Sequence, residues 1–329
     1  MRFFDPDLEV QQFPAWDCLP YDRVSPHPDI VGQRVDTLIQ LLTDRPGRVV
    51  VTTVNGLLQR VPPRAAFADT AFTAQIGSRV DVDALQAFLV RNGYAKAQTV
   101  RETGEYAVRG GIVDLFPPTS DLPLRLDLFG DELEAVRAFD PITQRTSEPR
   151  SSIRLTPMAE LQLDPDSIAR FRSGYRELFG AVAGDDPLYE SISAGRRHPG
   201  MEHWLPLFHD TMETLLDYTP GAVVTLDPQM AEAATARFSQ IADFHDARQT
   251  MRRAEKRGGS EIYKPLPADR LYLDQAALDE LLDRQAVARF SPFGAAGGGP
   301  DAGGRRGRDF VDARSNPDIN VFDSVLGHI

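Results

Sequence analysis

The residues of this chain that are best suited to specific chemistry lie in two strand-like segments within residues 101–129. In the second segment, 124–129 with the sequence LRLDLF, leucines alternate with other residues. Because strand side chains alternate between two faces, Arg125, Asp127 and Phe129 are expected to share the face opposite the leucines. An arginine and an aromatic residue on a polar strand face are typical of a protein-binding spot. The alternative is that Phe129 only folds under the following turn.

Arg109, which stands before two glycines at the end of the first segment, allows two interpretations. It can form a surface ion pair with Asp114 or Glu105, and such pairs stabilise little. It can instead donate two hydrogen bonds to a carboxylate on a partner protein. The local pattern alone favours the ion pair.

The chain lacks the residues of a nucleotide-binding loop. A P-loop needs a lysine followed by serine or threonine after a glycine-rich turn. The three lysines, Lys96, Lys256 and Lys264, precede alanine, arginine and proline. We therefore expect no nucleotide cofactor on this chain.

Cysteine and histidine do not form a predicted catalytic or metal site. The single cysteine, Cys18, has only His27 nearby in sequence, so a structural role is favoured over a nucleophilic one. Of the six histidines, only His203 and His209 come near a metal-ligand pair, and their spacing of six suits neither one helix face nor a turn. No pair of carboxylates lies among apolar residues that would shift their pKa values apart, as a general acid and a general base require. We therefore expect no catalytic residues and no metal ligands.

Composition sets limits on the class of protein. A chain of 329 residues can hold two or three domains. Its net charge of −12 argues against autonomous binding to duplex DNA, which requires a basic face. The sequence has no apolar run near the length of a membrane span, no signal-peptide pattern, and one cysteine, which excludes an internal disulfide. These features predict a cytoplasmic protein without a membrane segment.

Hydrophobic periodicity and turn residues divide the chain into five parts. Residues 1–70 have an α/β pattern, and residues 71–152 have the α+β pattern of one helix and an antiparallel sheet. Residues 153–290 return to mixed helices and strands. Residues 291–308 form a glycine-rich linker with a basic end. Residues 309–329 are expected to start a further domain.

Helix caps and apolar stripes give the elements that position the arginines and the phenylalanine. Asp81, Asp164 and Asp274 are predicted N-caps, and Gly93 follows the helix that Asp81 begins. The stem of Arg34 is expected on the apolar stripe of the first helix. The predicted helices are 29–42, 55–60, 82–92, one after Asp164, 227–253, 275–282 and one from 320, and the predicted strands include 48–53, 72–76, 112–116, 124–129, 222–226 and 271–273.

Several stretches resemble a known family. RETGEYAVRGGIVDLFP at 101–117 and LRLDLFGDELEAVRAFDPITQRT at 124–146 resemble the second domain of the excision-repair protein UvrB and the matching domain of transcription-repair coupling factors. AWDCLPYDRVSPHPDIVGQR at 15–34 and VNGLLQRVPPR at 54–64 resemble the coupling factors, and the tyrosine-rich hairpin of UvrB is absent there. The chain is therefore similar to the N-terminal UvrB-homology module of a coupling factor, and the likeness weakens after residue 185.

The resemblance implies a fold and a set of site residues. The fold would be a helicase-like α/β domain without a P-loop, interrupted by an α+β antiparallel-sheet domain that binds UvrA. In the family, an arginine before the glycine, the arginine of the LRLDLF strand and its last phenylalanine contact UvrA. Arg109, Arg125 and Phe129 match these three, and Glu105 and Asp127 are further candidates. One departure is the glycine pair after Arg109, where some members have Gly-Ala.

The same resemblance implies an adaptor rather than an enzyme. The module would recruit UvrA to stalled RNA polymerase in transcription-coupled nucleotide-excision repair. RNA polymerase and DNA would be bound by other domains of the parent, which would also hold the motor with its ATP and magnesium. We therefore expect this chain to be a fragment of a longer protein.

Two alternatives from other classes stay open. The chain can instead be a fragment of UvrB itself, whose nucleotide loop would lie upstream. It can also be an autonomous α/β domain that binds a small ligand between its first and third parts. Upstream coding sequence distinguishes the first alternative, and a thermal-shift screen with nucleotides distinguishes the second.

We predict that the chain neither binds nor hydrolyses ATP, because none of its lysines stands in a P-loop context. Isothermal titration with Mg-ATP is expected to give no heat of binding. A micromolar affinity would contradict this interpretation.

We also predict weak binding to bare duplex DNA, because the chain is acidic and its basic cluster is confined to 305–308. Gel shifts at physiological salt should show no complex below about 10⁻⁵ M, within the usual non-specific range. Tight DNA binding that persists after deletion of residues 293–308 would contradict this prediction.

Overall fold

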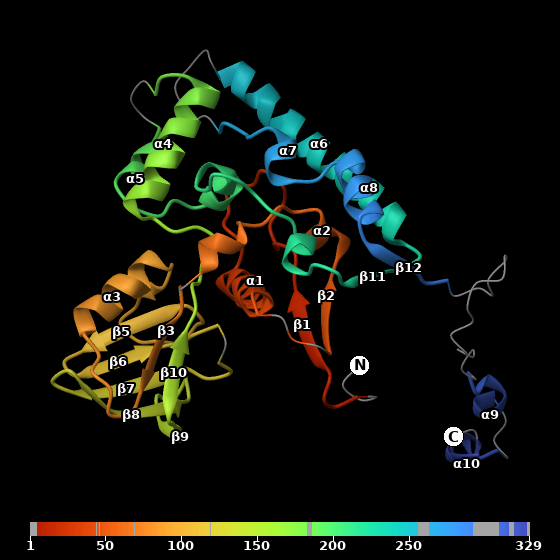
Figure 1. Cartoon of the computed structure of the whole chain (residues 1–329). Coiled ribbons are helices and arrows are strands. Elements are labelled where there is room, and N and C mark those ends of the chain that lie inside the picture. The colour runs from red at the N-terminus through yellow and green to blue at the C-terminus, as the bar shows by residue number, and fades with distance from the viewer. Residues whose placement is uncertain are drawn as a thin grey trace. The chain divides into compact units, whose positions relative to one another are not determined.

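The computed structural model describes residues 5–43, 45, 47–68, 70–118, 120–182, 186–255, 263–291, 309–315 and 319–327. The chain divides into two compact units, Met1–Ala288 and Arg289–Ile329. It is a mixed α/β structure with several sheets (Figure 1). In the part that is described, no helix is both long and apolar enough to cross a membrane. The predicted glycine-rich linker lies almost entirely outside the described residues.

The largest sheet has six strands in the order β4-β5-β6-β7-β8-β9. Neighbours from β5 to β9 are antiparallel, whereas β4 pairs with β5 in parallel. Two-residue turns join β5 to β6 and β7 to β8, and each begins with a glycine in the left-handed region, Gly110 at φ +59° and Gly130 at φ +64°. The strands are β4 (Ala95–Lys96), β5 (Glu105–Arg109), β6 (Ile112–Leu115), β7 (Leu124–Phe129), β8 (Glu132–Phe139) and β9 (Thr146–Arg150).

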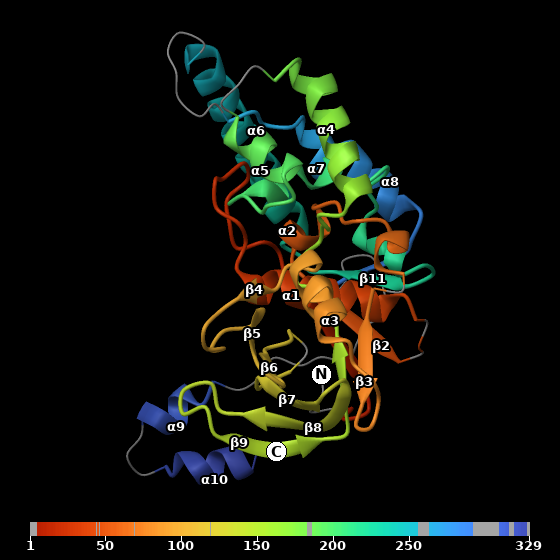
Figure 2. The ribbon, with the colours of Figure 1, turned by 90° about the vertical axis from the view of Figure 1, so that its left-hand side faces the viewer.

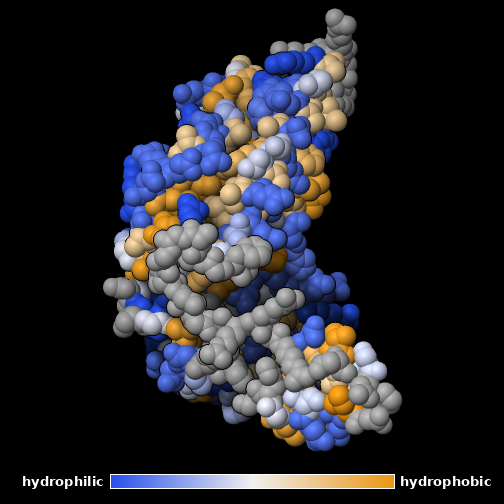
Figure 3. Space-filling model, turned by 90° about the vertical axis from the view of Figure 1, so that its right-hand side faces the viewer, coloured by the Kyte–Doolittle hydropathy of each residue, from blue (hydrophilic) through white to orange (hydrophobic). Residues whose placement is uncertain are grey.

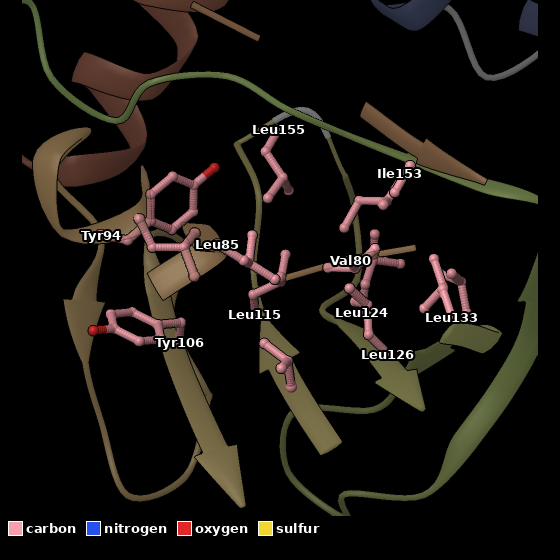
Figure 4. Packing of buried hydrophobic residues seen from close by; sticks show 14 of the residues in the cluster. Val80, Leu85, Tyr94, Tyr106, Leu115, Leu124, Leu126, Leu133, Ile153 and Leu155 are labelled. Atoms are coloured by element: carbon pink, nitrogen blue, oxygen red, sulfur yellow. The ribbon is translucent and has the colours of Figure 1, made fainter. Parts of the chain in front are cut away.

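One face of this sheet packs on α3 (Val82–Arg91) and on the antiparallel pair of β3 (Phe72–Gln75) and β10 (Ser152–Leu155). Figure 2 shows α3 lying beside the sheet. Asp81 caps α3, as predicted, because its carboxylate accepts hydrogen bonds from two backbone N–H groups of the first turn. The leucines of β7 all belong to this core, and Figure 4 shows Leu124 and Leu126 near Val80 in the same cluster as Leu85 of α3. The predicted alternation of β7 is therefore confirmed.

A smaller α/β part precedes the six-stranded sheet. Strands β1 (Glu9–Phe13) and β2 (Arg48–Thr52) are parallel, and α1 (Pro28–Leu41) connects them. The strand predicted at 48–53 is present as β2, but it is not the buried strand that its apolar run indicates, because Val51 is 45 % exposed. A parallel sheet is normally covered on both faces, and this one has two strands in the described residues.

The residues after the six-stranded sheet are mainly helical. Asp164 caps the first helix and Asp274 caps α8, both as predicted. Figure 3 shows that hydrophilic and hydrophobic residues alternate on the surface seen from the right-hand side of Figure 1. The elements are α4 (Pro165–Phe179), α5 (Pro187–Ser193), β11 (Val223–Leu226), α6 (Met230–Glu255), α7 (Ala268–Leu271), α8 (Gln275–Asp283) and β12 (Ala286–Arg289), with 3₁₀ turns at Arg64–Phe67, Met201–Leu207 and Leu215–Tyr218.

The second unit contains α9 (Val311–Ser315) and α10 (Val321–Leu326) in its described residues. Asn320 caps α10, because its side chain accepts a hydrogen bond from the backbone N–H of Phe322. The predicted helix from 320 is therefore present, but it ends at Leu326.

Three sequence predictions need correction. Residues 271–273 are not a strand, because Leu271 ends α7 and only Tyr272 makes an isolated bridge, with Gln59. The helix predicted at 55–60 is the single turn α2 (Val54–Leu57). Strand β9 was not predicted, since all five of its residues are exposed and one is proline, so it has no alternating apolar pattern.

The Arg34 side chain is buried more deeply than the sequence predicted. Its whole side chain is buried, not only its stem, and it joins α1 to the Glu160 carboxylate beyond β10. Its Nε lies 2.5 Å from Glu160 Oε1, and its Nη1 donates to the Pro14 carbonyl at 2.8 Å. The Trp16 indole N–H also donates to Glu160 Oε1, at 2.9 Å. The carboxylate is therefore satisfied inside the protein, which is the condition for burying a charge.

We predict that Glu160→Gln lowers the free energy of unfolding by about 3–5 kcal/mol, because it leaves the Arg34 charge buried without a counter-charge. Urea unfolding of both proteins measures the difference. The control is Glu280→Gln, which breaks an exposed pair with Arg284 and should change stability by less than about 0.5 kcal/mol. Equal midpoints for Glu160→Gln and the unchanged protein would contradict the role of the buried pair.

Candidate protein-binding surface

The face of the six-stranded sheet that points away from α3 carries the residues singled out in the sequence. We call it the outer face and define it by Arg109, Ile112, Arg125, Asp127 and Phe129. Strand pairing sets Arg109 opposite Ile112, and Ile112 opposite Asp127, so three neighbouring strands contribute to one row. The β-sheet therefore gathers residues that are up to 20 positions apart in the chain.

Phe129 is the most exposed aromatic residue of this face. It is 75 % exposed, although it lies at the end of a strand whose leucines are buried. The bland interpretation, in which Phe129 folds under the turn, is therefore wrong for this structure. A large apolar side chain held in solvent on a rigid strand is suited to fill a pocket on a partner.

Arg109 and Arg125 share one buried carboxylate, that of Asp114 on β6. Asp114 is fully buried, and its Oδ2 lies 2.5 Å from Arg109 Nη2. Arg125 binds the same carboxylate through two nitrogens, Nε to Oδ1 at 2.6 Å and Nη2 to Oδ2 at 2.9 Å. The ion pair predicted for Arg109 is thus formed with Asp114 and not with Glu105. Sequence reasoning missed that Arg125 joins it.

Arg125 is held more firmly than Arg109. Its guanidinium carbon lies 4.8 Å from the centre of the Phe139 ring, which is a cation–π distance. The hydrogen bonds with Asp114 raise the pKa of Arg125 above its ordinary value, so the group stays charged. The Arg125 side chain is 19 % exposed, whereas that of Arg109 is 51 % exposed. The two arginines therefore differ in what they can offer to a partner.

The two further candidates, Glu105 and Asp127, have partners inside the protein. The Glu105 carboxylate accepts hydrogen bonds from the backbone N–H groups of Arg101 and Glu102, at 2.7 and 3.0 Å, and so closes the turn before β5. Asp127 pairs with Arg137 of β8. Arg137 was not predicted as a site residue, although strand pairing sets it next to Arg125. Contact of Glu105 or Asp127 with a partner stays a prediction.

The glycine pair between β5 and β6 controls how closely the strands approach. A Cβ atom on Gly111 would lie 2.4 Å from the Leu128 carbonyl oxygen, which is too short for a real contact. An alanine there would have to shift the backbone of β7 next to Phe129. The position at which some family members have alanine thus requires glycine in this structure.

Cys18 makes a contact that the sequence did not reveal. Its Sγ lies 3.9 Å from Nε2 of His203, which is 185 positions away. Burial raises the pKa of Cys18 to about 12 and lowers the pKa of His203 to about 4. At neutral pH both groups are uncharged, and a thiol without its thiolate form is a poor nucleophile. The contact supports the structural role predicted for Cys18.

His203 and His209, the histidines weighed as a metal-ligand pair, have separate partners in the structure. His209 Nε2 lies 3.2 Å from the Glu160 carbonyl oxygen, whereas His203 packs edge-on against Trp16. Within the described ranges, no three His, Cys, Asp or Glu side chains are grouped as a metal site requires.

Comparison with known proteins identifies the part of the chain that carries the outer face. A family model described as the UvrB interaction domain matches residues 72–161, which contain the six-stranded sheet, α3, β3 and β10. The outer face thus lies wholly within the residues that match the UvrB interaction domain.

Comparison with whole proteins gives the family. The chain is 37 % identical over 267 residues to the transcription-repair-coupling factor of Haemophilus influenzae, which covers 81 % of this chain and 22 % of that protein. It is 38 % identical over 276 residues to the factor of Escherichia coli K12, and this match covers 84 % of this chain and 23 % of that protein. It is 32 % identical over 283 residues to the factor of Rickettsia bellii, and this match covers 86 % of this chain and 25 % of that protein. The chain belongs to the family of transcription-repair-coupling factors. It spans about a quarter of the length of these relatives.

Proposed function

We propose that this chain is an adaptor module that binds UvrA through the outer face. The observation that carries the proposal is the placement of Phe129 on β7 and Arg109 on β5, both exposed on one sheet within the matched UvrB interaction domain. Aromatic and arginine side chains are the residues that most often dominate binding energy at interfaces. In this proposal Phe129 fills an apolar pocket on UvrA, and the arginines face its acidic groups.

The wider role rests on the family. A transcription-repair-coupling factor that captures UvrA would bring the excision machinery to a stalled RNA polymerase, in the cytoplasm. RNA polymerase and DNA would be bound by parts of the relatives beyond the matched quarter. The motor with its ATP and magnesium would also belong to those parts, so the proposed role of this chain is binding and not catalysis.

The proposed fold of the flanking residues is a helicase-like α/β domain without a nucleotide loop. Its support is the parallel pair β1–β2 with its connecting helix α1, followed by further strands and helices after the interaction domain. The proposed parts of the chain remain 1–70, 71–152, 153–290, 291–308 and 309–329. The core shared by α3 and the sheet supports the second of them.

We predict that Phe129→Ala and Arg125→Ala each weaken UvrA binding about thirtyfold, because truncation of such anchors typically costs about 2 kcal/mol. Isothermal titration or a quantitative pull-down with cognate UvrA, at equal concentrations of folded protein, measures the loss. The matched control is Arg150→Ala in β9, which removes an exposed arginine from another strand of the same sheet and should leave binding unchanged.

A core variant separates binding from folding. Leu126→Ala removes a side chain from the opposite face of β7, so it should lower stability without removing a contact with UvrA. Full capture of UvrA by both Phe129→Ala and Arg125→Ala would mean that the outer face is not the interface.

A further inference from the structure

The turn between β8 and β9 presents an apolar side chain to solvent. Ile142, at the tip of this turn, is 85 % exposed, which is the highest fraction of any large apolar residue in the part of the chain that the structure describes. Single exposed apolar residues are common on protein surfaces. The meaning of this one therefore depends on how the turn holds it and on what lies next to it.

The backbone on the first side of the tip is fixed by Asp140. Its carboxylate Oδ1 accepts hydrogen bonds from the backbone N–H groups of Ile142 and Thr143, at 2.9 and 2.6 Å, and from the Thr143 hydroxyl at 3.0 Å. The hydrogen bonds from Thr143 hold the pKa of Asp140 below its ordinary value, so the accepting carboxylate stays charged at neutral pH. Pro141 restricts its own φ angle between Asp140 and the tip. The chain itself thus sets the position of Ile142.

Gln144 holds the other side of the turn in a strained conformation. Its φ angle is +60°, in the left-handed region that residues other than glycine seldom adopt. Its side-chain Nε2 donates to the carbonyl oxygens of Pro141 and Val100, at 2.7 and 3.1 Å. The first bond closes the turn, and the second ties it to the segment before β5. Backbone strain that side-chain hydrogen bonds maintain is a sign that the direction of the turn matters.

A small apolar cluster seats the turn on the outer side of the sheet. Phe139, which precedes Asp140, packs in this cluster with Ala107 of β5, apart from the main core. Ala107 lies opposite Asp114, whose carboxylate binds the two arginines of the outer face, and directly opposite residues share a face. Arg125 lies over the Phe139 ring, and its Nη1 is 3.4 Å from the Gln144 carbonyl oxygen. The turn is therefore continuous with the outer face.

We propose that Ile142 is a second apolar anchor for UvrA, at the opposite end of the outer face from Phe129. The inference rests on the proposed UvrA binding and extends it to a further pocket on that partner. Phe129 ends β7 and the turn meets the face at Arg125, so roughly 13 Å of strand separates the two points. A standard interface buries about 800 Å² on each partner and is roughly 30 Å across, so one partner can cover both ends. UvrA would then offer two apolar pockets on either side of the acidic groups that face the arginines.

The experiment is a titration of the full chain with cognate UvrA. Ile142→Ala and Ile142→Thr should each weaken binding about tenfold, because each removes most of the apolar surface that the partner would bury. Threonine keeps the β-branched shape at the tip, so it separates the loss of apolar contact from a change in the turn. Since Ile142 is exposed, neither variant should change the midpoint of urea unfolding.

The matched controls are Val90→Ala and Val90→Thr. Val90 is also β-branched and is 60 % exposed, but it belongs to α3, on the other side of the sheet. Both control variants should bind UvrA as tightly as the unchanged protein.

The outcomes separate this inference from the proposed function. If Phe129→Ala and Arg125→Ala weaken binding but both Ile142 variants do not, the second anchor is overturned while the proposed function stands. Full binding by Ile142→Thr with weak binding by Ile142→Ala would also overturn it, because the loss would then come from the turn and not from apolar contact. Equal losses for the Ile142 and Val90 variants would count against it in the same way. Unchanged binding by the Phe129, Arg125 and Ile142 variants together would overturn the proposed function as well.

Discussion

The buried ion pair of Arg34 and Glu160 ties together parts of the chain that are distant in sequence. Glu160 follows the last strand of the interaction domain, whereas Arg34 belongs to the helix between β1 and β2. Both charged groups are removed from water, so each depends on the other and on the indole N–H of Trp16. Close packing supports the same junction, since a Cβ on Gly32 of α1 would lie 2.6 Å from Cβ of Pro118. The position of the six-stranded sheet relative to α1 depends on this junction.

A buried carboxylate also organises the outer face, but there it holds an arginine at the surface. A buried carboxylate requires cations, and Asp114 draws two arginines from neighbouring strands. Glu160 is enclosed completely, so its pair can only stabilise the fold. Asp114 lies under the surface, so one of its arginines, Arg109, remains half exposed on the sheet that also carries Phe129. A partner would therefore meet side chains that are already held in position, which lowers the entropy lost on binding.

Local sequence patterns predicted the elements of the interaction domain well. The alternation of LRLDLF fixed which residues of β7 are buried, and Asp81, Asp164 and Asp274 cap helices because their carboxylates reach backbone N–H groups of the first turn. What could not be predicted depends on distant partners. The Arg34–Glu160 pair spans 126 positions and the Cys18–His203 contact spans 185, and no short-range pattern reports either. A charged residue within the apolar run of β6 was a signal for Asp114, but only strand register shows that Arg125 lies opposite it.

The most direct test of the account is site-specific photocross-linking of UvrA from position 129. Phe129 is replaced by benzoylphenylalanine, the full chain is mixed with cognate UvrA and irradiated, and covalent products are measured. The control places the same group at Val90, which is 60 % exposed on α3, on the other side of the sheet. The account predicts a strong UvrA cross-link from position 129 and a weak one from position 90. Cross-linking from position 90 but not from position 129 would contradict it.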